Sequence, residues 1–322
     1  MQIWSPDEVS SAVAALRAGR LVGMPTETVY GLAGNALEAQ VVASIFAAKQ
    51  RPTFDPLIVH AATAGAALGM AAGVPEEAGV LADRFWPGPL TLVLPRDPSL
   101  PELLSAGLDT VAFRVPQHPV ARRLIEECGF PLAAPSANRF GGISPTRADH
   151  VVAELSDQPA VAGVIDAGPC AFGLESTVVG FPQPGRAVVY RLGGLTVEQL
   201  REVLDDLEVV RAFDAVDDPT LARRGEQSPG MLARHYAPRT GLILLDEGEM
   251  LPEHHRGKST AHLGLEDLSE SGCLVEAAAN LFGRLRMIDE GGFDLIVARR
   301  VPDEGLGRAI NDRLYRAAVE KS

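Results

Sequence analysis

Lysine is nearly absent from this sequence, since it supplies only three of the 29 basic residues, at Lys49, Lys258 and Lys321. Lys49 is therefore the only lysine before residue 258. In a chain that otherwise uses arginine, a retained lysine points to a site that needs a compact ammonium rather than a planar guanidinium. Retention by chance explains the same fact equally well, so both interpretations stay open at this stage.

Cysteine is also rare. Cys128, Cys170 and Cys273 are far apart and form no CxxC pair, which argues against a disulfide framework and against a thiolate metal site. Such cysteine usage fits a reducing compartment, so we expect a cytoplasmic protein. The histidines of the polar segment 254–262 have no metal-site spacing, and we predict no resident metal ligands.

Long apolar runs and targeting signals are missing as well. No apolar run approaches the ~18 residues that a membrane helix needs, and the first residues lack the basic start and apolar stretch of a signal peptide. We therefore expect no contact with a membrane. The motifs HExxH, GxSxG and GxxxxGK[ST] are also absent, which disfavours zinc hydrolysis, the usual serine-hydrolase elbow and a Walker phosphate loop.

Positive charge is in deficit, because the formal net charge is −13. Non-specific affinity for nucleic acids comes from neutralising phosphates. A general nucleic-acid coat protein is therefore excluded, and any contact with RNA or a nucleotide must use a local cationic site. Hydrophobic residues make up 46% of the chain, which is enough for a large core and excludes disorder as the main state.

The order of the patterns predicts an α/β protein. A length of 322 residues suggests about two domains, and several strands follow one another without a helix, which indicates a mixed sheet. Ser5 and Glu8 fit a capping box at the start of the first helix. We expect helices at 6–17, 37–49, 75–86, 119–128, 148–155 and 197–204, and strands at 21–24, 57–59, 90–94, 111–115, 131–134, 161–165, 177–179 and 187–191.

The periodicity fades after residue 207 and returns after 240, which divides the chain into an N-terminal domain (1–207), a linker (208–240) and a C-terminal domain (241–322). In the last domain we expect strands at 242–245 and 295–298 and helices at 275–288 and 310–319. A long irregular segment between domains is usually functional or disordered. Because its stretch SPGMLARHYAP (228–238) is apolar and aromatic, we predict that the linker is a lid.

Polar side chains gather where the predicted strands end, which is where α/β proteins commonly bind ligands. The loop PTETVYGL (25–32) offers hydroxyls, a carboxylate and a phenol; a solvated turn is the alternative. Lys49 and Arg51 converge if the chain is extended there, and such a pair suits a polyphosphate. Cations that stabilise a helix C-terminus are the alternative.

Further strand ends carry similar groups. Arg114 shares a strand face with Thr110 and Ala112, which suits a carboxylate clamp; a surface arginine is the alternative. The segment 134–146 offers hydroxyls, an amide and glycine-freed backbone N–H groups, as a phosphate cradle or as an ordinary polar loop. With Arg191 at the end of another strand, these groups together predict an anionic substrate.

At this point a family becomes recognisable. The segments that carry the resemblance are PTETVYGL (25–32), KQRP and DPLIVH (49–60), WPGPLTLVL (86–94), TVAFRVPQHP (110–119), APSANRFGGISPT (134–146) and ESTVV (175–179). In order and spacing the chain resembles the YrdC family of threonylcarbamoyl-AMP synthases. SPGMLARHYAP (228–238) and the residues after it are similar to the longer, two-domain members.

The resemblance implies a twisted mixed-sheet YrdC-like domain with a concave cationic cavity, and a smaller Rossmann-like α/β C-terminal domain. It implies a nucleotidyltransferase that converts L-threonine, bicarbonate or CO2, and ATP into threonylcarbamoyl-AMP and pyrophosphate, with Mg²⁺ accompanying ATP. The product serves the threonylcarbamoyladenosine modification of tRNA, so the implied partners are the downstream tRNA threonylcarbamoyl-transferase machinery and tRNA itself.

The family's site residues are carried over position by position. The predicted catalytic pair is Lys49 and Arg51, which neutralise phosphate charge, and we expect Lys49 to act on the nucleotide or carbamate rather than on folding. The implied contacts with L-threonine are Thr28, His60, Arg114, Ala134 and Ser176, with Ala134 acting through its backbone. The implied contacts with ATP are Arg51, Asp55, Thr110, Ser136, Asn138, Ser144, Arg191 and Tyr236. Asp55 is a departure, because the family usually has Asn there.

Two rival functions come from other classes. One is an RNA-binding module, which the net charge disfavours and which a product assay separates from an enzyme. The other is a carbamoyl-handling domain of the hydrogenase-maturation type, which normally brings acylphosphatase and zinc-finger segments that this sequence lacks.

Overall fold

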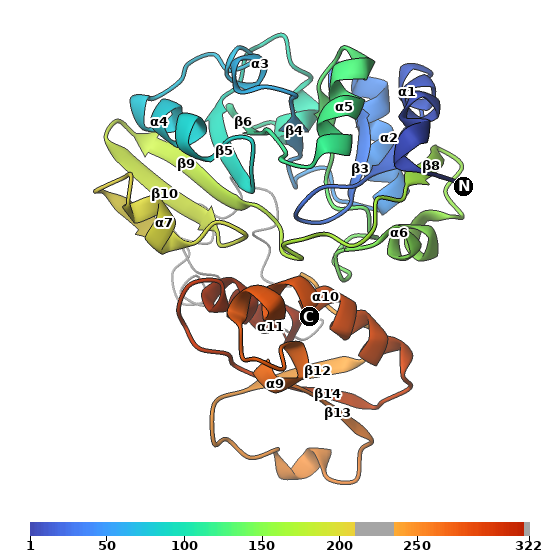
Figure 1. Cartoon of the computed structure of the whole chain (residues 1–322), viewed down its shortest axis with the longest axis vertical. Coiled ribbons are helices and arrows are strands. Elements are labelled where there is room, and N and C mark those ends of the chain that lie inside the picture. Colours follow the sequence, from blue (N-terminus) through green and yellow to red (C-terminus); the bar gives the residue numbers. More distant parts are fainter. Residues whose placement is uncertain (210–234, 319–322) are drawn as a thin grey trace.

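The computed structural model describes residues 1–209 and 235–318, which form two α/β domains, one above the other in Figure 1. The N-terminal domain is built on an 11-stranded sheet in the order β1-β8-β2-β3-β7-β4-β6-β5-β9-β10-β11. Strand β4 pairs with β6 in parallel, whereas β5 pairs with β6 antiparallel. The predicted mixed sheet is therefore confirmed.

The strands of this sheet are β1 (Gln2–Trp4), β2 (Leu21–Met24), β3 (Gly31–Asn35), β4 (Ile58–His60), β5 (Leu90–Pro95), β6 (Thr110–Arg114), β7 (Leu132–Ala133), β8 (Val161–Ile165), β9 (Thr177–Gln183), β10 (Arg186–Arg191) and β11 (Leu207–Val209). The helices of the same domain are η1 (Pro6–Glu8), α1 (Val9–Arg17), α2 (Ala39–Lys49), α3 (Ala64–Leu68), α4 (Glu76–Phe85), η2 (Glu102–Ser105), α5 (Pro119–Cys128), α6 (Ala148–Leu155) and α7 (Val197–Arg201).

Two apolar clusters fix the helices on the sheet. One buries Val9 and Leu16 of α1 and Leu124 of α5 with Met24 and Leu132 of the sheet. The other and larger cluster includes the buried faces of α2, α4 and α6. Helices thus cover the sheet from more than one side, and the strand ends between them remain available for polar residues.

The predicted elements agree closely where the hydrophobic period is regular. Helices α5 and α6 and strand β8 have the predicted bounds, and Ser5 and Glu8 form the predicted capping box. Strands β1, β3 and β11 were not predicted. Strand β3 has the sequence GLAGN and is buried throughout, so it shows neither the alternation nor the β-branched residues by which a strand is usually identified.

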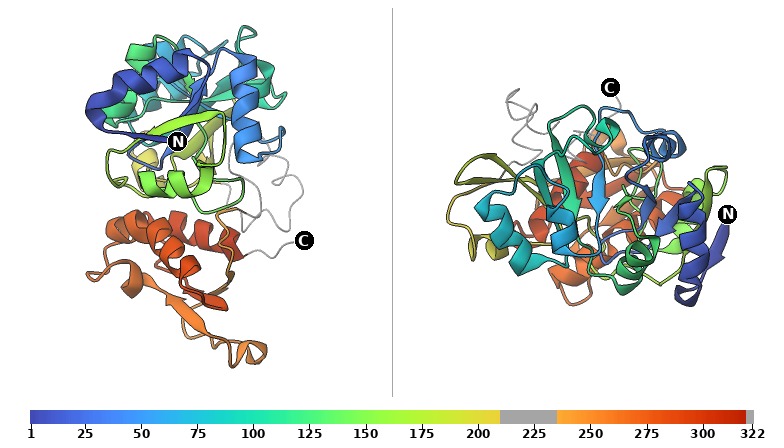
Figure 2. Two further views of the ribbon diagram at one scale, coloured as in Figure 1. Left: turned by 90° about the vertical axis from the view of Figure 1, so that its right-hand side faces the viewer. Right: turned by 90° about the horizontal axis from the view of Figure 1, so that it is seen from above.

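The C-terminal domain contains a three-stranded parallel sheet in the order β12-β14-β13. Its elements are β12 (Gly241–Leu245), η4 (Glu253–His255), β13 (Thr260–Leu263), α9 (Leu265–Leu268), α10 (Leu274–Glu290), β14 (Leu295–Arg299) and α11 (Gly307–Ala318). Helices α10 and α11 lie between this sheet and the N-terminal domain (Figures 1 and 2). Strand β13 was not predicted, whereas the helices at 275–288 and 310–319 correspond to α10 and α11.

The predicted linker is described only at its two ends. Glu208 and Val209 belong to β11, which pairs with β10 in parallel, and the chain is described again from His235. Residues 210–234, on which the lid prediction mainly rests, lie outside the described residues, as do 319–322. None of the helices in the described ranges combines the length and apolar character needed to cross a bilayer.

Candidate active site

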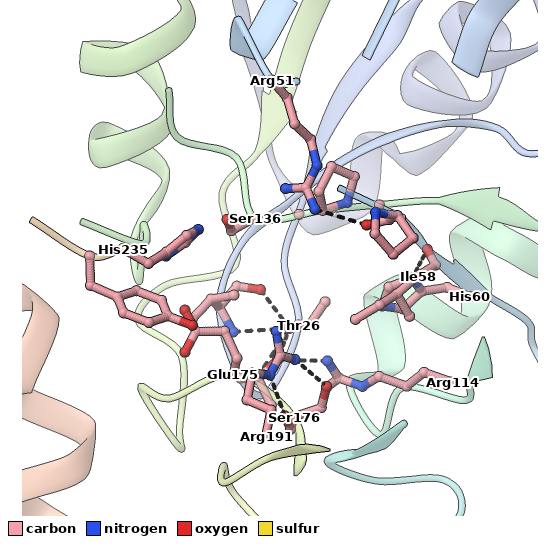
Figure 3. Close-up of a pocket in the computed structure, with 17 residues that line it drawn as sticks. Thr26, Arg51, Ile58, His60, Arg114, Ser136, Glu175, Ser176, Arg191 and His235 are labelled. Atoms are coloured by element: carbon pink, nitrogen blue, oxygen red, sulfur yellow. Dashed lines mark hydrogen bonds between the residues drawn. The ribbon is translucent and has the colours of Figure 1, made fainter. Parts of the chain in front are cut away.

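A polar pocket lies where strands β4 and β6 end, between several loops of the N-terminal domain and the described start of the C-terminal part (Figure 3). Its volume is about 50 Å³. The residues that line it are Thr26, Thr28, Val29, Gly31, Arg51, Pro56, Ile58, His60, Arg114, Ala134, Pro135, Ser136, Glu175, Ser176, Arg191, His235 and Tyr236.

Arg114 is the last residue of β6 and is buried. Its Nη1 donates to Thr28 Oγ1 at 2.8 Å, its Nη2 to Glu27 Oε1 at 2.5 Å and its Nε to Gly88 O at 3.3 Å. Burial by itself favours a neutral Glu27, but the charge and hydrogen bond of Arg114 outweigh it and lower the pKa of that carboxyl. Glu27 thus stays ionised and holds the guanidinium at the pocket.

His60 ends strand β4 and stands beside Arg114 in the parallel pairing of β4 with β6. Burial, and then the neighbouring charge of Arg114, lower the pKa of His60 to about 3. Its Nδ1 lies 3.3 Å from Ile58 O. Because the ring is neutral near pH 7, His60 offers the pocket a neutral hydrogen-bonding group and no charge.

Arg51 follows helix α2, whose capping residue Gln50 has the left-handed conformation with φ of 54°. Its Nη2 lies 2.8 Å from Asp55 Oδ1 and 2.8 Å from Pro56 O, and its Nε donates to Asp55 O at 3.0 Å. Nη1 has no hydrogen-bond partner among the described residues. This donor can therefore bind an anion in the pocket without the loss of a protein contact.

Lys49 is buried, and its ammonium donates to the backbone oxygens of Ser136 and Asn138. Burial, and then the charge of Arg51, lower the pKa of Lys49 to about 7. The side chain is not part of the pocket lining. The structure thus adds a bond from Lys49 to the loop after β7 that the sequence did not predict, whereas its action on a substrate stays a prediction.

Ser176 and Arg191 meet at the ends of two adjacent antiparallel strands, β9 and β10. Arg191 Nη2 donates to Ser176 Oγ at 3.0 Å and its Nε to Ser176 O at 3.0 Å. The oxygens Ser176 Oγ and Thr91 Oγ1 lie 2.7 Å apart. Glu175, which precedes Ser176 in the sequence, accepts a hydrogen bond from Ser144 Oγ. Glu175, Ser176 and Arg191 thus form one wall of the pocket, and Thr91 and Ser144 support it from behind.

The loop after β7 forms another wall. Ala134, Pro135 and Ser136 line the pocket, and Ser136 forms an isolated bridge with Gly31. Asn138 lies outside the lining, where its amide donates to Arg139 O at 2.7 Å and Gly142 O at 2.9 Å. The amide therefore fixes the shape of this loop from behind.

His235 and Tyr236 close the pocket from the described start of the C-terminal part. Tyr236 has a φ of 62° and is buried, with its ring 5.6 Å from that of Phe282 of α10. His235 Nδ1 and Tyr236 Oη are buried and have no hydrogen-bond partner among the described residues. Buried polar atoms in native proteins are normally paired, so these two atoms are suited to a ligand in the pocket.

Among the described residues, those around the pocket offer no set of side chains that fits a resident metal ion. In the residues that the structure describes, no three histidines, cysteines or acidic residues come together as metal ligands. The carboxylates around the pocket are engaged with arginines, as in Asp55 with Arg51 and Glu27 with Arg114. A Mg²⁺ ion at this site must therefore take its main ligands from a substrate phosphate.

The structure brings most of the predicted site residues together. The residues that line the pocket as a group are Thr28, Arg51, His60, Arg114, Ala134, Ser136, Ser176, Arg191 and Tyr236. Asp55 and Ser144 lie behind it on Arg51 and Glu175. Thr110 begins β6, at the opposite end of that strand from Arg114, a separation of ~13 Å at the usual rise per residue. For the residues that do not line the pocket, contact with the nucleotide stays a prediction.

Several pocket residues were not assigned by the sequence. Thr26 and Glu175 stand in segments that the sequence marks as polar strand ends, so their neighbourhood was a usable signal. His235 directly precedes the predicted Tyr236. Ile58 and Pro56 carried no signal, because apolar side chains at a strand start are usually core.

Comparisons with known proteins agree over nearly the whole chain. A family model for Sua5, YciO and YrdC proteins, described as "Telomere recombination", matches residues 14–193, and the model "Threonylcarbamoyl-AMP synthase, C-terminal domain" matches residues 195–319. The threonylcarbamoyl-AMP synthase of Bacillus subtilis (strain 168) is 39% identical over 97% of this chain and 93% of its own length. The crystal structure of Pyrococcus abyssi Sua5 complexed with L-threonine has a TM-score of 0.89 and 37% identity, and the match covers 99% of this chain and 98% of that one.

Proposed function

The chain belongs to the Sua5/YrdC family as a two-domain threonylcarbamoyl-AMP synthase, and from this premise we propose how its pocket divides between the substrates. L-Threonine occupies the end formed by β4, β6 and the start of β9. Its carboxylate binds Arg114, and its remaining polar groups bind Thr28, His60, Ser176 and the backbone of Ala134. The threonine named in the Pyrococcus abyssi structure supports this assignment of substrate class.

ATP occupies the other end of the pocket. Its phosphates lie against Arg51, with Ser136 and Arg191 as further donors and the unpartnered atoms of His235 and Tyr236 close by. In Figure 3, Arg51 and Arg114 enter the pocket from different sides, which supports one cationic group for each substrate.

The reaction then requires positioning and charge neutralisation more than a strong base. The threonine amine adds to CO2 with loss of a proton to solvent, or to bicarbonate with loss of water, and forms a carbamate. A carbamate oxygen attacks the α-phosphorus of ATP, and the bond to the β-phosphate oxygen breaks to release pyrophosphate. Arg51 neutralises phosphate charge, and Lys49 holds the loop that carries Ser136. When Mg²⁺ is bound with ATP, it neutralises further phosphate charge.

The C-terminal domain and the consumer of the product complete the proposed function. The parallel sheet of the C-terminal domain supports a Rossmann-like arrangement, with the third strand in sequence at its centre. The adenylate is an activated acyl phosphate, and its consumer is the machinery that transfers threonylcarbamoyl to tRNA.

The observation that carries the proposal is the convergence of Arg51, Arg114 and Arg191 in one pocket of a chain with a formal net charge of −13. The test is a product assay on the full chain with L-threonine, bicarbonate and ATP. We expect threonylcarbamoyl-AMP and pyrophosphate in equal amounts, and neither when threonine or bicarbonate is omitted. Pyrophosphate release that is independent of threonine contradicts the division of the pocket.

A further inference from the structure

Arg313 of helix α11, in the C-terminal domain, is buried behind the lining of the substrate pocket. Its exposed fraction is 0%. The Nε atom of Arg313 lies 2.9 Å from Glu175 Oε2 across the domain boundary, and Nη2 donates to Leu192 O at 2.7 Å. Nη1 lies 2.6 Å from Asp312 Oδ2 on the same helix. Every nitrogen of this guanidinium is therefore engaged.

The two acceptors in the N-terminal domain stand next to pocket residues on neighbouring strands. Glu175 and Ser176 immediately precede β9, and Leu192 immediately follows Arg191 at the end of β10. These strand ends touch closely, because a Cβ atom on Gly193 would lie 2.2 Å from Glu175 O. Arg313 thus bridges the two strand ends whose side chains, Ser176 and Arg191, form one wall of the pocket.

Arg313 also fixes the aromatic residue at the pocket. Its guanidinium carbon lies 4.8 Å from the ring centroid of Tyr236, a distance suited to a cation–π contact. The ring of Tyr236 stacks on Phe282 of α10 as well. Helices α10 and α11 together therefore determine where the Tyr236 hydroxyl lies.

Other ion pairs cross the same domain boundary without reaching the pocket. Arg308, on the same helix as Arg313, pairs with Glu198 of α7, and neither residue lines the pocket. Arg286 of α10 pairs with Glu154 of α6 at 3.0 Å. Simple attachment of the domains is thus supplied elsewhere, whereas the partner of Arg313 is itself a lining residue.

We propose that Arg313 is a positioning residue for the substrate pocket, through which the C-terminal domain sets the geometry of Ser176, Arg191 and Tyr236. The inference rests on the proposed function, because that function assigns Ser176 to threonine. Arg313 touches neither substrate and acts through Glu175 and the two strand ends. A misplacement of a binding group by about 1 Å is enough to cost ~10²-fold in rate.

The test compares full-length variants in a steady-state assay of threonylcarbamoyl-AMP formation, with thermal unfolding measured in parallel. We expect Arg313→Gln to lower kcat/KM for threonine by ~10²-fold, and Arg313→Lys to recover part of this loss, because an ammonium can still face Glu175. Arg308→Met removes an ion pair from the same helix and should keep kcat/KM within about twofold, since exposed pairs contribute little.

A cycle with Ser176→Ala separates positioning from general stability. If Arg313 acts partly through the strand end that carries Ser176, the loss in the double variant should be clearly smaller than the product of the two single losses, because the changes share one interaction. If the losses multiply instead, or if Arg313→Gln and Arg308→Met lower activity alike, the inference is wrong.

Two further results keep the experiment decisive. Removing one partner of a buried ion pair leaves the other charge uncompensated and can unfold the protein. The double variant Glu175→Gln with Arg313→Gln avoids this problem, because it removes both charges. If that variant folds and is fully active, the inference is wrong. If Ser176→Ala leaves the KM for threonine unchanged, the assignment of the threonine site fails. If Ser176→Ala raises that KM and Arg313→Gln does not, only the role of Arg313 fails.

Discussion

Glu27 Oε1 and Arg114 Nη2 lie 2.5 Å apart in an ion pair whose side chains are 6% and 4% exposed. The guanidinium that we assign to the threonine carboxylate is thus already held by a carboxylate of the protein. Its Nη1 donates a hydrogen bond to Thr28 Oγ1, and its Nε donates one to Gly88 O. A bound carboxylate must therefore share or replace these acceptors, and the geometry of the fork decides the affinity.

Arg114→Lys should raise the KM for threonine by at least ~10-fold, with a smaller effect on the KM for ATP. An ammonium cannot reproduce the planar fork that serves Glu27, Thr28 and a ligand together. Steady-state kinetics with each substrate varied in turn measure the two constants. The matched control is Arg51→Lys, which should raise the KM for ATP more than the KM for threonine. If either variant changes both constants equally, the division of the pocket between the two substrates is contradicted.

Lys49→Met should lower turnover by ~10²-fold, the scale of losing one preorganised donor at a site, and should also lower the melting temperature by ~4–8 °C. The second effect follows because the oxygens of Ser136 and Asn138 lose their common donor, and an unsatisfied buried acceptor costs about 1–3 kcal/mol. Differential scanning calorimetry and the product assay measure the two effects. The exposed Lys258→Met is the control, and an unchanged melting temperature would restore the view that Lys49 acts on substrates alone.

The stability of the protein should decrease as pH falls from about 6.5 toward 3. The folded chain keeps His60 neutral, because burial and Arg114 lower its pKa to about 3, whereas the unfolded chain takes up a proton near the ordinary value of 6.5. The unfolded state therefore binds more protons between these pH values. As the pH is lowered, the free energy of unfolding decreases, by at most ~1.4 kcal/mol per pH unit for this histidine.

Denaturant unfolding at several pH values checks this pH dependence. His60→Gln should show a shallower fall than the wild type, and His254→Gln, on the exposed η4, should keep the wild-type slope. If the free energy of unfolding has the same pH dependence in the wild type and in His60→Gln, His60 takes up its proton in the folded state as readily as in the unfolded state.

Mg²⁺ should bind only together with the nucleotide. The described residues group no three metal-binding side chains, and Mg²⁺ prefers phosphate oxygens and water to such partial protein sites. Titration calorimetry of Mg²⁺ into the protein alone should give no binding heat, and titration in the presence of an ATP analogue with a non-cleavable α–β bond should give a saturable signal. Binding of Mg²⁺ to the nucleotide-free protein at micromolar affinity would reveal a resident site.

The sequence predicted the elements whose burial is periodic. Helix α5 buries Ala121, Leu124, Ile125 and Cys128, which recur at helical spacing, and its bounds were predicted without error. Strand β3 is buried on both faces and consists largely of small residues. Its identity depends on β2 and β7 on either side, and long-range pairing of that kind leaves no local pattern.

The pocket could be predicted where a polar residue ends a strand, as at His60, Arg114 and Arg191. The partner of each charge could not. Arg114 and Glu27 are 87 residues apart in sequence, and Glu175 and Arg313 are 138 apart. No spacing rule joins such residues, because their contact depends on how the sheet and the C-terminal helices pack.

One glycine permits a close approach between the two domains. Gly173 has a φ of 67°, and a Cβ atom there would lie 2.5 Å from the backbone of Ala279 in helix α10. The loop that leads to Glu175 thus has room for a hydrogen atom and for nothing larger. A library that varies residue 173 and is selected for growth should return glycine alone. Such strict selection is usually taken as a sign of a catalytic or binding residue. Gly173 touches no substrate, however, and is required only because the two domains approach closely there.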